Sequence, residues 1–373
     1  MKFVYLLVMM IFLSYSKNML TQIPSDDVSI HKIYLELTQR CNLHCVNCFR
    51  QNWTSPDTQM TQEIFDHFLS SLKQIDTLKE IILGGIGEPT IHPNFVEWVN
   101  QLPKVDLCVT TNAYHWNNET IELLANRFDR IVISVDGLES TFLKLRSFEF
   151  KILEENIKKL INLRNQLGQY KPFLIAQLVL STDNVNEIEE LIPKLAKMGF
   201  MKIIISNLLP QNEHDKDKIL YTLFENKKME EYRNIWLNKA MSHQIQIKFP
   251  AIQLKTERRC NFVHDGTLTI NSDGNISPCY RFAHPSVEYV FGRRKQVYPF
   301  HYGNIVDQSV TDIWNSRLYT DLRLQNLRNR FPSCPDCDRV DCCDYINDSL
   351  CDCRGQNPSC ADCLWTRDFV QCI

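Results

Sequence analysis

Between residues 32 and 207 the chain alternates short apolar runs with longer stretches in which apolar residues recur every three or four positions. The short runs predict strands and the longer stretches predict amphipathic helices, because side chains repeat with period 2 in a strand and 3.6 in a helix. The predicted strands are 33–37, 80–83, 105–110, 130–134, 173–180 and 202–206. The predicted helices are 61–75, one starting near 93, 118–128, 152–167 and 185–198. Six such βα units on a parallel sheet predict an α/β fold with a partial (β/α)6 barrel, since a closed barrel needs eight.

Beyond residue 207 the pattern changes twice. Residues 220–241 predict a charged amphipathic helix and residues 245–249 a short strand. Farther on, two alternating apolar runs flank Asp273-Gly274, a pair typical of a β-hairpin turn, and 311–328 predict a helix. We therefore expect an N-terminal extension, a core, a helical connector and a cysteine-rich α+β domain, at 1–30, 31–215, 216–258 and 259–373.

With 373 residues, 44% hydrophobic and 23% charged, the chain has the composition of an ordinary globular protein. A formal net charge of -3 gives no electrostatic support for binding to nucleic acid, so we expect no such partner. Residues 3–13 form an apolar run that is too short to span a bilayer, and no cleavage site follows it. We expect a dispensable extension on a cytoplasmic protein, with membrane association of the N-terminus as the alternative.

Three of the 15 cysteines, Cys41, Cys45 and Cys48, stand close together after the first predicted strand. Thiolates at this spacing select zinc, copper(I) or an iron–sulfur cluster. A closed zinc site needs a fourth ligand, whereas a [4Fe–4S] cluster held by three cysteines leaves one iron open to a small ligand. The spacing alone leaves the cluster and a partial zinc site as alternatives.

Small and polar residues follow the other predicted strands at the same edge of the sheet. These segments are Gly84–Pro89, Thr110–Asn112, Ser134–Gly137 and Ser206–Asn207. Ligands of α/β sheets and barrels bind at the carboxyl ends of the strands, and glycine lets a ligand approach the backbone closely. We therefore expect a ligand-binding rim that includes the cysteine loop.

The motif Cys41-x3-Cys45-x2-Cys48, followed one strand later by Gly85-Ile-Gly87-Glu88-Pro89, resembles the radical S-adenosylmethionine (SAM) enzymes. The resemblance implies that the three cysteines hold a [4Fe–4S] cluster whose open iron binds SAM. It also implies reductive cleavage of SAM to a 5′-deoxyadenosyl radical, which removes a hydrogen atom from the substrate.

The same resemblance implies a set of SAM-binding residues, namely Gly85, Gly87, Glu88, Asn112, Ser134, Asp136 and Arg146. For Arg146, a solvent-exposed helix residue is the alternative. The family often has an aromatic residue near the adenine at the position before the third cysteine, whereas this chain has Asn47.

Eleven further cysteines lie between Cys260 and Cys372, and their order resembles the SPASM domain of many radical SAM enzymes. That resemblance implies one or two auxiliary [4Fe–4S] clusters, with ligands from Cys260, Cys279, Cys334, Cys337, Cys343, Cys353, Cys360, Cys363 and Cys372. Cys342 and Cys351 are expected to be spare, and Asn347 replaces the fourth cysteine of the usual run. Zinc sites built from the paired cysteines, and disulfides in an exported protein, are the alternatives.

The amino-acid sequence of the tail resembles the maturases of tungsten-cofactor oxidoreductases at Ser333–Asp338, Cys343–Tyr345 and Asn357–Trp365. This likeness implies an enzyme that matures the cofactor of a tungsten-dependent aldehyde oxidoreductase. The implied partners are that oxidoreductase or its pterin cofactor, with ferredoxin or flavodoxin as the electron donor. The chain departs from the group at Cys342, where glycine is usual, and at Arg354, where tryptophan is usual.

Two other functions remain open. A SPASM enzyme that modifies a precursor peptide would share the radical chemistry. Sulfatase-maturing relatives carry an aspartate that acts as a general base after the SPASM cysteine, whereas this chain has Tyr280 there, which weakens that variant. A zinc- or disulfide-stapled cysteine-rich binding protein would lack that chemistry altogether. The sequence assigns no catalytic residue beyond the cofactor ligands.

Overall fold

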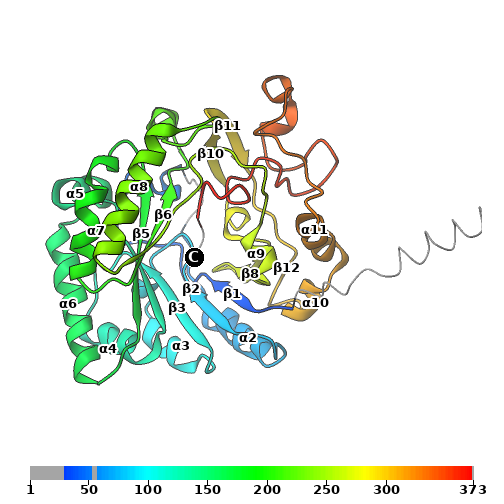
Figure 1. The fold of residues 1–373 in the computed structure, drawn as a ribbon. Helices are drawn as coiled ribbons and strands as arrows, with labels where there is room; N and C mark the ends of the chain where they lie inside the picture. Colours follow the sequence, from blue (N-terminus) through cyan, green and yellow to red (C-terminus); the bar gives the residue numbers. More distant parts are fainter. Residues whose placement is uncertain (1–28, 53–56, 372–373) are drawn as a thin grey trace, which may run out of the picture.

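The computed structural model describes residues 29–52 and 57–371. At its centre lies an open sheet of ten strands in the order β12-β9-β8-β1-β2-β3-β4-β5-β6-β7 (Figure 1). The strands are β1 (Lys32–Leu35), β2 (Glu80–Leu83), β3 (Asp106–Thr111), β4 (Arg130–Ser134), β5 (Phe173–Leu180), β6 (Lys202–Asn207), β7 (Gln246–Lys248), β8 (Thr267–Ile270), β9 (Asn275–Ser277) and β12 (Gly303–Asn304). Strands β1 to β7 run parallel, and the edge strands β7 and β12 pair only with their inner neighbours β6 and β9 among the described residues, so the sheet stays open. This arrangement confirms the α/β class and the incomplete barrel.

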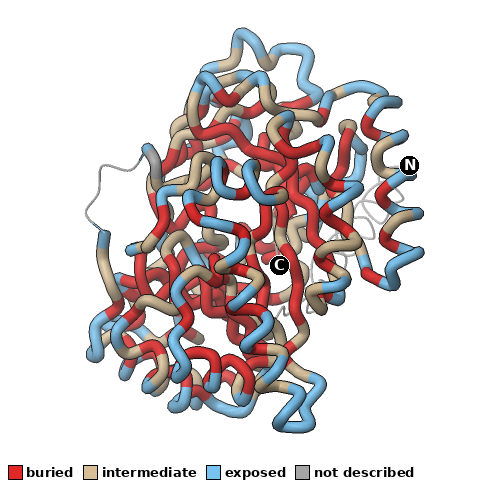
Figure 2. The backbone as a smooth tube through the Cα atoms, turned by 90° about the vertical axis from the view of Figure 1, so that its left-hand side faces the viewer, coloured by how far each residue is buried: buried red, intermediate tan, exposed pale blue. Residues whose placement is uncertain are grey.

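The strands are apolar on both faces because both faces of the sheet are covered, as is usual for parallel sheets. Ile33 and Ile81, which pair in register, pack into the main core beneath the helices. Tyr34 and Ile82, one position on, face the concave side and pack into a second, smaller cluster. Buried segments accordingly run through the middle of the molecule (Figure 2).

Helices line the outer side of the sheet (Figure 1). They are α2 (Gln62–Leu72), α3 (Phe95–Gln101), α4 (Asn118–Arg127), α5 (Glu139–Arg146), α6 (Phe150–Gln166), α7 (Ile188–Lys197) and α8 (Lys227–Ser242). The sequence prediction lacks α5, because this short helix buries only Phe142 and Leu145. It also starts α8 too early, since Asn226 caps the helix by accepting a hydrogen bond from Met229 N (3.2 Å).

The C-terminal part folds over the concave side of the sheet. It contains α9 (Asn261–His264), the hairpin of β10 (Ser286–Val290) and β11 (Arg293–Val297), α10 (Val310–Trp314) and α11 (Arg317–Leu327). The hairpin predicted at Asp273-Gly274 is confirmed by the antiparallel pair β8–β9. The prediction of a single helix at 311–328 is wrong, because this segment forms two helices, α10 and α11. Strand β8 also pairs with β1, so one sheet continues across the boundary predicted at residue 259.

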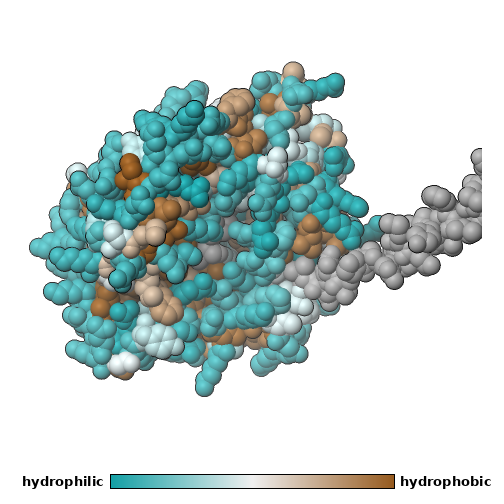
Figure 3. Space-filling view, in the orientation of Figure 1, coloured by the Kyte–Doolittle hydropathy of each residue, from teal (hydrophilic) through white to brown (hydrophobic). Residues whose placement is uncertain are grey.

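The predicted N-terminal extension lies outside the described residues as far as residue 28. None of the described helices is long and apolar enough to cross a membrane. The face shown in Figure 3 is mostly hydrophilic, with hydrophobic residues gathered only in scattered groups.

Candidate active site

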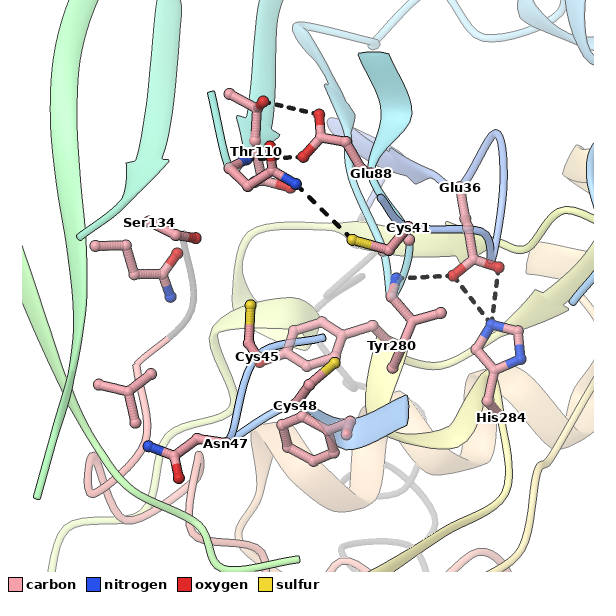
Figure 4. A pocket seen from close by; sticks show the side chains of 18 of the residues that line it. Glu36, Cys41, Cys45, Asn47, Cys48, Glu88, Thr110, Ser134, Tyr280 and His284 are labelled. Atoms are coloured by element: carbon pink, nitrogen blue, oxygen red, sulfur yellow. Dashed lines mark hydrogen bonds and ion pairs between the residues drawn. The ribbon is translucent and has the colours of Figure 1, made fainter. Parts of the chain in front are cut away.

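A cavity of about 300 Å³ opens at the carboxyl ends of the parallel strands. It is lined by the three motif cysteines and by every residue predicted to bind SAM, namely Cys41, Cys45, Cys48, Gly85, Gly87, Glu88, Asn112, Ser134, Asp136 and Arg146. Figure 4 shows the three thiols on one side of this space and the ends of the strands on the other. The structure therefore brings the predicted set together, and the ligand role of each residue stays a prediction.

The cysteine loop is held between α5 and the glycine-rich loop. Val46 N donates a hydrogen bond to Leu145 O (3.0 Å), which ties the middle of the loop to α5. Gly87 lies so close to the backbone of residues 38–40 that a Cβ there would overlap it. Glycine is required at this position because the two loops are in backbone contact.

Burial raises the pKa of the Cys41 thiol to about 11 and shifts the pKa of Cys48 in the same direction. Both thiols are therefore protonated at neutral pH in the metal-free protein, and metal binding must release these protons. Arg146 Nη1, 3.8 Å from Cys45 Sγ, places a positive charge beside the loop.

Glu36 at the end of β1 supports the glycine-rich loop. Its Oε2 accepts a hydrogen bond from Ile86 N (3.0 Å), and a Cβ on Gly85, whose φ is +114°, would lie 2.5 Å from the same oxygen. His284 Nε2 lies 2.8 and 3.0 Å from the two carboxylate oxygens (Figure 4). This buried pair joins the glycine-rich loop to the C-terminal part of the chain.

Glu88 organises the end of β3. Its Oε2 accepts from Asn112 N (2.7 Å), and its Oε1 accepts from Thr111 Oγ1 (2.7 Å) and Thr90 N (3.2 Å). Burial raises the pKa of Glu88, while these hydrogen bonds favour its charged form. Asn112 Nδ2 is thereby placed 3.8 Å from Cys41 Sγ.

Asp136 and Arg146 form a second buried pair at the end of β4. Arg146 Nε lies 2.6 Å from Asp136 Oδ2, and Asp136 Oδ1 accepts a hydrogen bond from Val179 N (2.8 Å). Burial by itself lowers the pKa of Arg146, but the charges of Asp136 and Cys45 outweigh burial and raise it. The alternative of a solvent-exposed Arg146 is wrong, because only 14% of its side chain is accessible.

Several residues of the cavity wall were not predicted from the sequence. They include Glu36 on the core side and Tyr280, Arg281, His284, Ser286 and Gln371 on the C-terminal side. The one available signal was the hairpin at Asp273-Gly274, which turns the segment after Cys279 back toward the sheet. The direction of that turn toward the glycine-rich loop is not visible in the sequence.

Four C-terminal thiols gather beside the concave face of the sheet, and we call Cys260, Cys279, Cys360 and Cys363 the first thiol set. Burial raises the pKa of Cys260, and the nearby charges of the other three thiols raise it further. The pKa of Cys279 rises to about 12, again mainly through burial. Cys260 and Cys279 also pack against the apolar cluster around Tyr34.

A second group contains Cys334, Cys337, Cys343 and Cys353, and we call it the second thiol set. Burial raises the pKa of Cys334 to about 12, and the charges of Cys343 and Cys353 contribute. Cys337 joins through a tight turn, in which its N–H donates to Cys334 O (3.3 Å). Cys337 and Cys353 are exposed, so this set lies nearer to the surface than the first.

The remaining cysteines of the tail have other surroundings. Cys342 is exposed, Cys351 Sγ lies 3.3 Å from Asp352 O, and Cys372 lies outside the described residues. Among the residues that the structure describes, no three Cys, His, Asp or Glu side chains stand close enough to hold a single metal ion. Both thiol sets are thus spaced more widely than a single-ion site.

The cavity fits a bound molecule that has both hydrogen-bond donors and acceptors. Asn47 lines it, and both polar atoms of its side chain are buried without a hydrogen-bond partner in the protein. Buried amide groups are normally paired, so the wall is incomplete without a ligand. The cavity thus combines three thiols, which can hold an iron–sulfur cluster, with an unpaired amide that can bind a polar ligand such as SAM.

Comparison with known proteins agrees with this chemistry. Residues 35–220 match the model of the radical SAM superfamily, and residues 260–338 match that of the SPASM iron–sulfur cluster-binding domain. The chain is 36% identical over 351 residues to the tungsten-containing aldehyde ferredoxin oxidoreductase cofactor-modifying protein of Pyrococcus furiosus, and the alignment covers 91% of this chain and 96% of that protein. The probable GTP 3′,8-cyclase of Pyrococcus abyssi is 27% identical over 184 residues, which are 49% of this chain and 58% of that protein.

Solved structures show the same fold at low sequence identity. Streptococcus suis SuiB bound to its precursor peptide SuiA superposes with a TM-score of 0.61 at 17% identity, over 90% of this chain and 76% of SuiB. The protein anSMEcpe with bound AdoMet superposes with a TM-score of 0.56 at 14% identity, over 83% of this chain and 87% of the other. The chain is therefore an enzyme whose cofactors are a [4Fe–4S] cluster, SAM and auxiliary iron–sulfur clusters. It belongs to the radical SAM superfamily, in the group whose C-terminal part is a SPASM domain.

Proposed function

We propose that Cys41, Cys45 and Cys48 hold the SAM-cleaving [4Fe–4S] cluster. The three thiols lie together on the wall of the cavity, and no fourth cysteine lines it within the described chain. A cluster with three thiolate ligands keeps one iron open, and SAM occupies that iron when it is bound. When bound, this cofactor pair supplies the 5′-deoxyadenosyl radical.

The protein residues around that position orient SAM. Glu88 Oε2 has only one hydrogen-bond donor in the protein, from Asn112, and so retains capacity for the methionyl ammonium group. Gly85, which is exposed, and Gly87, which is half-buried, both line the cavity, and their lack of side chains allows the methionine moiety to approach closely. Asp136 and Arg146, fixed by each other, present one carboxylate and one guanidinium at the end of β4 toward the remaining polar groups of SAM. Ser134 lies beside them.

The two thiol sets are the proposed ligands of two auxiliary clusters. Each set supplies four thiols, the number that fully ligates a [4Fe–4S] cluster. Asn347 stands where the usual run has its fourth cysteine, and both sets reach four thiols without that position. This assignment leaves Cys342 and Cys351 as spares and requires no contribution from Cys372.

We further propose that the enzyme modifies the cofactor of a tungsten-dependent aldehyde oxidoreductase. The observation that carries this proposal is the 36% identity with the P. furiosus cofactor-modifying protein, which extends over both the core and the cysteine-rich tail. The oxidoreductase or its pterin cofactor is then the partner, and ferredoxin or flavodoxin supplies the electron for SAM cleavage.

The test is to produce a tungsten-dependent aldehyde oxidoreductase in a host with and without this enzyme. We expect active oxidoreductase and a mass change in its extracted pterin only when the enzyme is present, and neither with the variant C41A/C45A/C48A. Full oxidoreductase activity without the enzyme would refute the tungsten assignment.

A precursor peptide is the second candidate substrate, since SuiB, which shares the fold, is bound to its peptide SuiA. Small peptides encoded beside the gene provide the assay, in which a mass change upon incubation with SAM and reductant is measured. A modified peptide together with an unmodified pterin would select this alternative.

A further inference from the structure

Arg281 is a buried cation that the proposed SAM chemistry does not use. It follows Cys279 by two residues, in the 3-10 turn Tyr280–Phe282, and lines the cavity. Only 2% of its side chain is accessible, and its Nε donates a hydrogen bond to Glu288 Oε2 (3.1 Å). A second bond, from Nη2 to Glu288 Oε1, makes this a two-point pair.

The third guanidinium nitrogen, Nη1, is buried and has no hydrogen-bond partner in the protein. Leaving a buried charged donor unpaired is costly, so the position calls for an acceptor that the protein itself does not provide. Glu288 occupies the other two nitrogens and supplies no acceptor to Nη1.

The guanidinium also lies near the first thiol set. Asp362 lies between Cys360 and Cys363 in the sequence, and its Oδ1 is 3.8 Å from Arg281 Nη2. The positive charge of Arg281 opposes the rise that burial causes in the pKa of Cys279, Cys360 and Cys363, which places it beside three thiols of the set.

The second thiol set also has buried cations beside it, but their donors find acceptors within the protein. Arg367, with 3% of its side chain accessible, donates from Nη1 to Lys255 O (2.6 Å), and its Nη2 lies 3.3 Å from Asp336 Oδ1, between Cys334 and Cys337 in the sequence. Lys295 Nζ pairs with Asp362 Oδ2 (2.9 Å) and lies 3.3 Å from Ile346 O. Lys295 thus has partners within the protein, and two of the four cysteines of this set are exposed. Cluster potentials rise with hydrogen bonds and positive charge near the sulfurs and also depend on solvent exposure.

We propose that Arg281 Nη1 donates a hydrogen bond to a sulfur atom of the cluster held by the first thiol set, and that this bond raises the reduction potential of that cluster. The inference rests on the ligand assignment proposed above. Because Arg281 also lines the cavity, the cluster it tunes is the one beside the substrate. That cluster is therefore the one suited to exchange an electron with a substrate bound in the cavity.

The test uses full-length protein carrying C41A/C45A/C48A, so that only the auxiliary clusters remain, and measures midpoint potentials by redox titration followed by electron paramagnetic resonance. In this background we compare R281Q, the charge-balanced R281Q/E288Q and R367Q. R281Q and R281Q/E288Q are expected to lower the potential of one auxiliary signal at unchanged iron content, and R367Q, beside the second thiol set, is expected to leave that signal in place. The double variant guards against misfolding, because it leaves no buried carboxylate without its partner.

Two outcomes would overturn the proposal. An unchanged potential in both arginine variants would make Arg281 a purely structural ion-pair residue, and so would loss of iron from both. C260A/C360A separates the proposal from its premise, because a set left with two thiols must lose this signal if the first thiol set holds that cluster. If the signal survives in C260A/C360A, the ligand assignment itself is wrong, whatever the arginine variants show.

Discussion

The motif loop and the first thiol set of this enzyme differ in how many thiols they gather and in what surrounds them. The motif loop places three thiols on the wall of a cavity of about 300 Å³, facing the polar ends of four parallel strands. The first thiol set gathers four thiols against aromatic side chains, among them Phe262, Tyr280 and Trp365. An incomplete ligand set that faces a cavity suits binding of a reacting molecule, whereas a complete and enclosed set suits electron transfer.

The arginines beside the motif loop and the first thiol set also differ in how their side chains are paired. Arg146, next to the motif loop, is held by Asp136, and both residues line the cavity. Arg281, next to the first thiol set, is held by Glu288 and keeps one buried nitrogen unpaired. Both arginines line the cavity, but the nitrogens of Arg146 face Asp136 and the Cys45 thiol, whereas Arg281 keeps one donor unused beside the thiols proposed to hold an auxiliary cluster.

The difference between the motif loop and the first thiol set is tested most directly by removing thiols from each of them in turn. The variant C41A/C45A/C48A is expected to lose SAM cleavage completely, because the open iron disappears with its ligands, and to lose about four irons per chain. The measurements are iron content after anaerobic reconstitution and 5′-deoxyadenosine released with dithionite and SAM. Retained release would show that another group of cysteines carries the reactive cluster.

Substitution in the first thiol set should have a narrower effect. C360A is expected to lose iron but to keep SAM cleavage without substrate at nearly the rate of the unsubstituted enzyme, since the motif loop is intact. Turnover of the true substrate should fall far more than SAM cleavage does. C342A is the matched control, because Cys342 lies in the same tail and is expected to be spare. Equal loss of SAM cleavage in C360A and C41A/C45A/C48A would contradict the division of roles.

The next test concerns the glycine-rich loop. Gly85→Ala puts a methyl group 2.5 Å from Glu36 at a φ of +114°, so the loop must shift away from its present position. Strain of about 1–3 kcal/mol predicts SAM binding weaker by roughly tenfold to a hundredfold. Titration calorimetry with the reconstituted enzyme measures the affinity.

Gly168→Ala is the control for that experiment. Gly168 also has a positive φ, +66°, but nothing lies within 4 Å of the added methyl group. It should therefore lower the stability of the protein by about 1 kcal/mol without changing SAM affinity. Equal effects of the two substitutions on SAM binding would show that Gly85 acts only through general stability.

The core of the fold was predictable because its signals are local. The apolar runs at 80–83, 130–134 and 173–180 match β2, β4 and β5 to the residue, since buried parallel strands contain little else. Parallel strands also place their carboxyl ends at one edge, so the loops after them converge without any knowledge of tertiary contacts. For this reason all the predicted SAM residues line one cavity.

The far wall of the cavity was not predictable in the same way. His284 meets Glu36 across 248 positions of the chain, and Ser272 meets Gln39 across 233. Such contacts depend on the parallel pairing of β8 with β1, which no short pattern in either segment specifies. The grouping of the tail cysteines into two sets depends likewise on how the tail folds back, rather than on their spacing.

The smallest effect is expected at the contact between Glu36 and His284, which joins the glycine-rich loop to the C-terminal part of the chain. His284→Leu removes one of the donors to Glu36 and leaves its carboxylate with weaker support, so the hydrogen bond from Ile86 N holds the glycine-rich loop less firmly. A loss of about 1 kcal/mol corresponds to SAM affinity that is weaker by roughly fivefold, measured by the same calorimetry. His284→Gln keeps a donor near the position of Nε2 and should bind SAM nearly as the unsubstituted enzyme does. If both variants bind SAM normally, the C-terminal part contributes to the cavity wall without supporting the SAM loop, and the two regions are independent at this point. If only the leucine variant is impaired, the domain that holds the auxiliary cysteines also shapes the site where the radical is made.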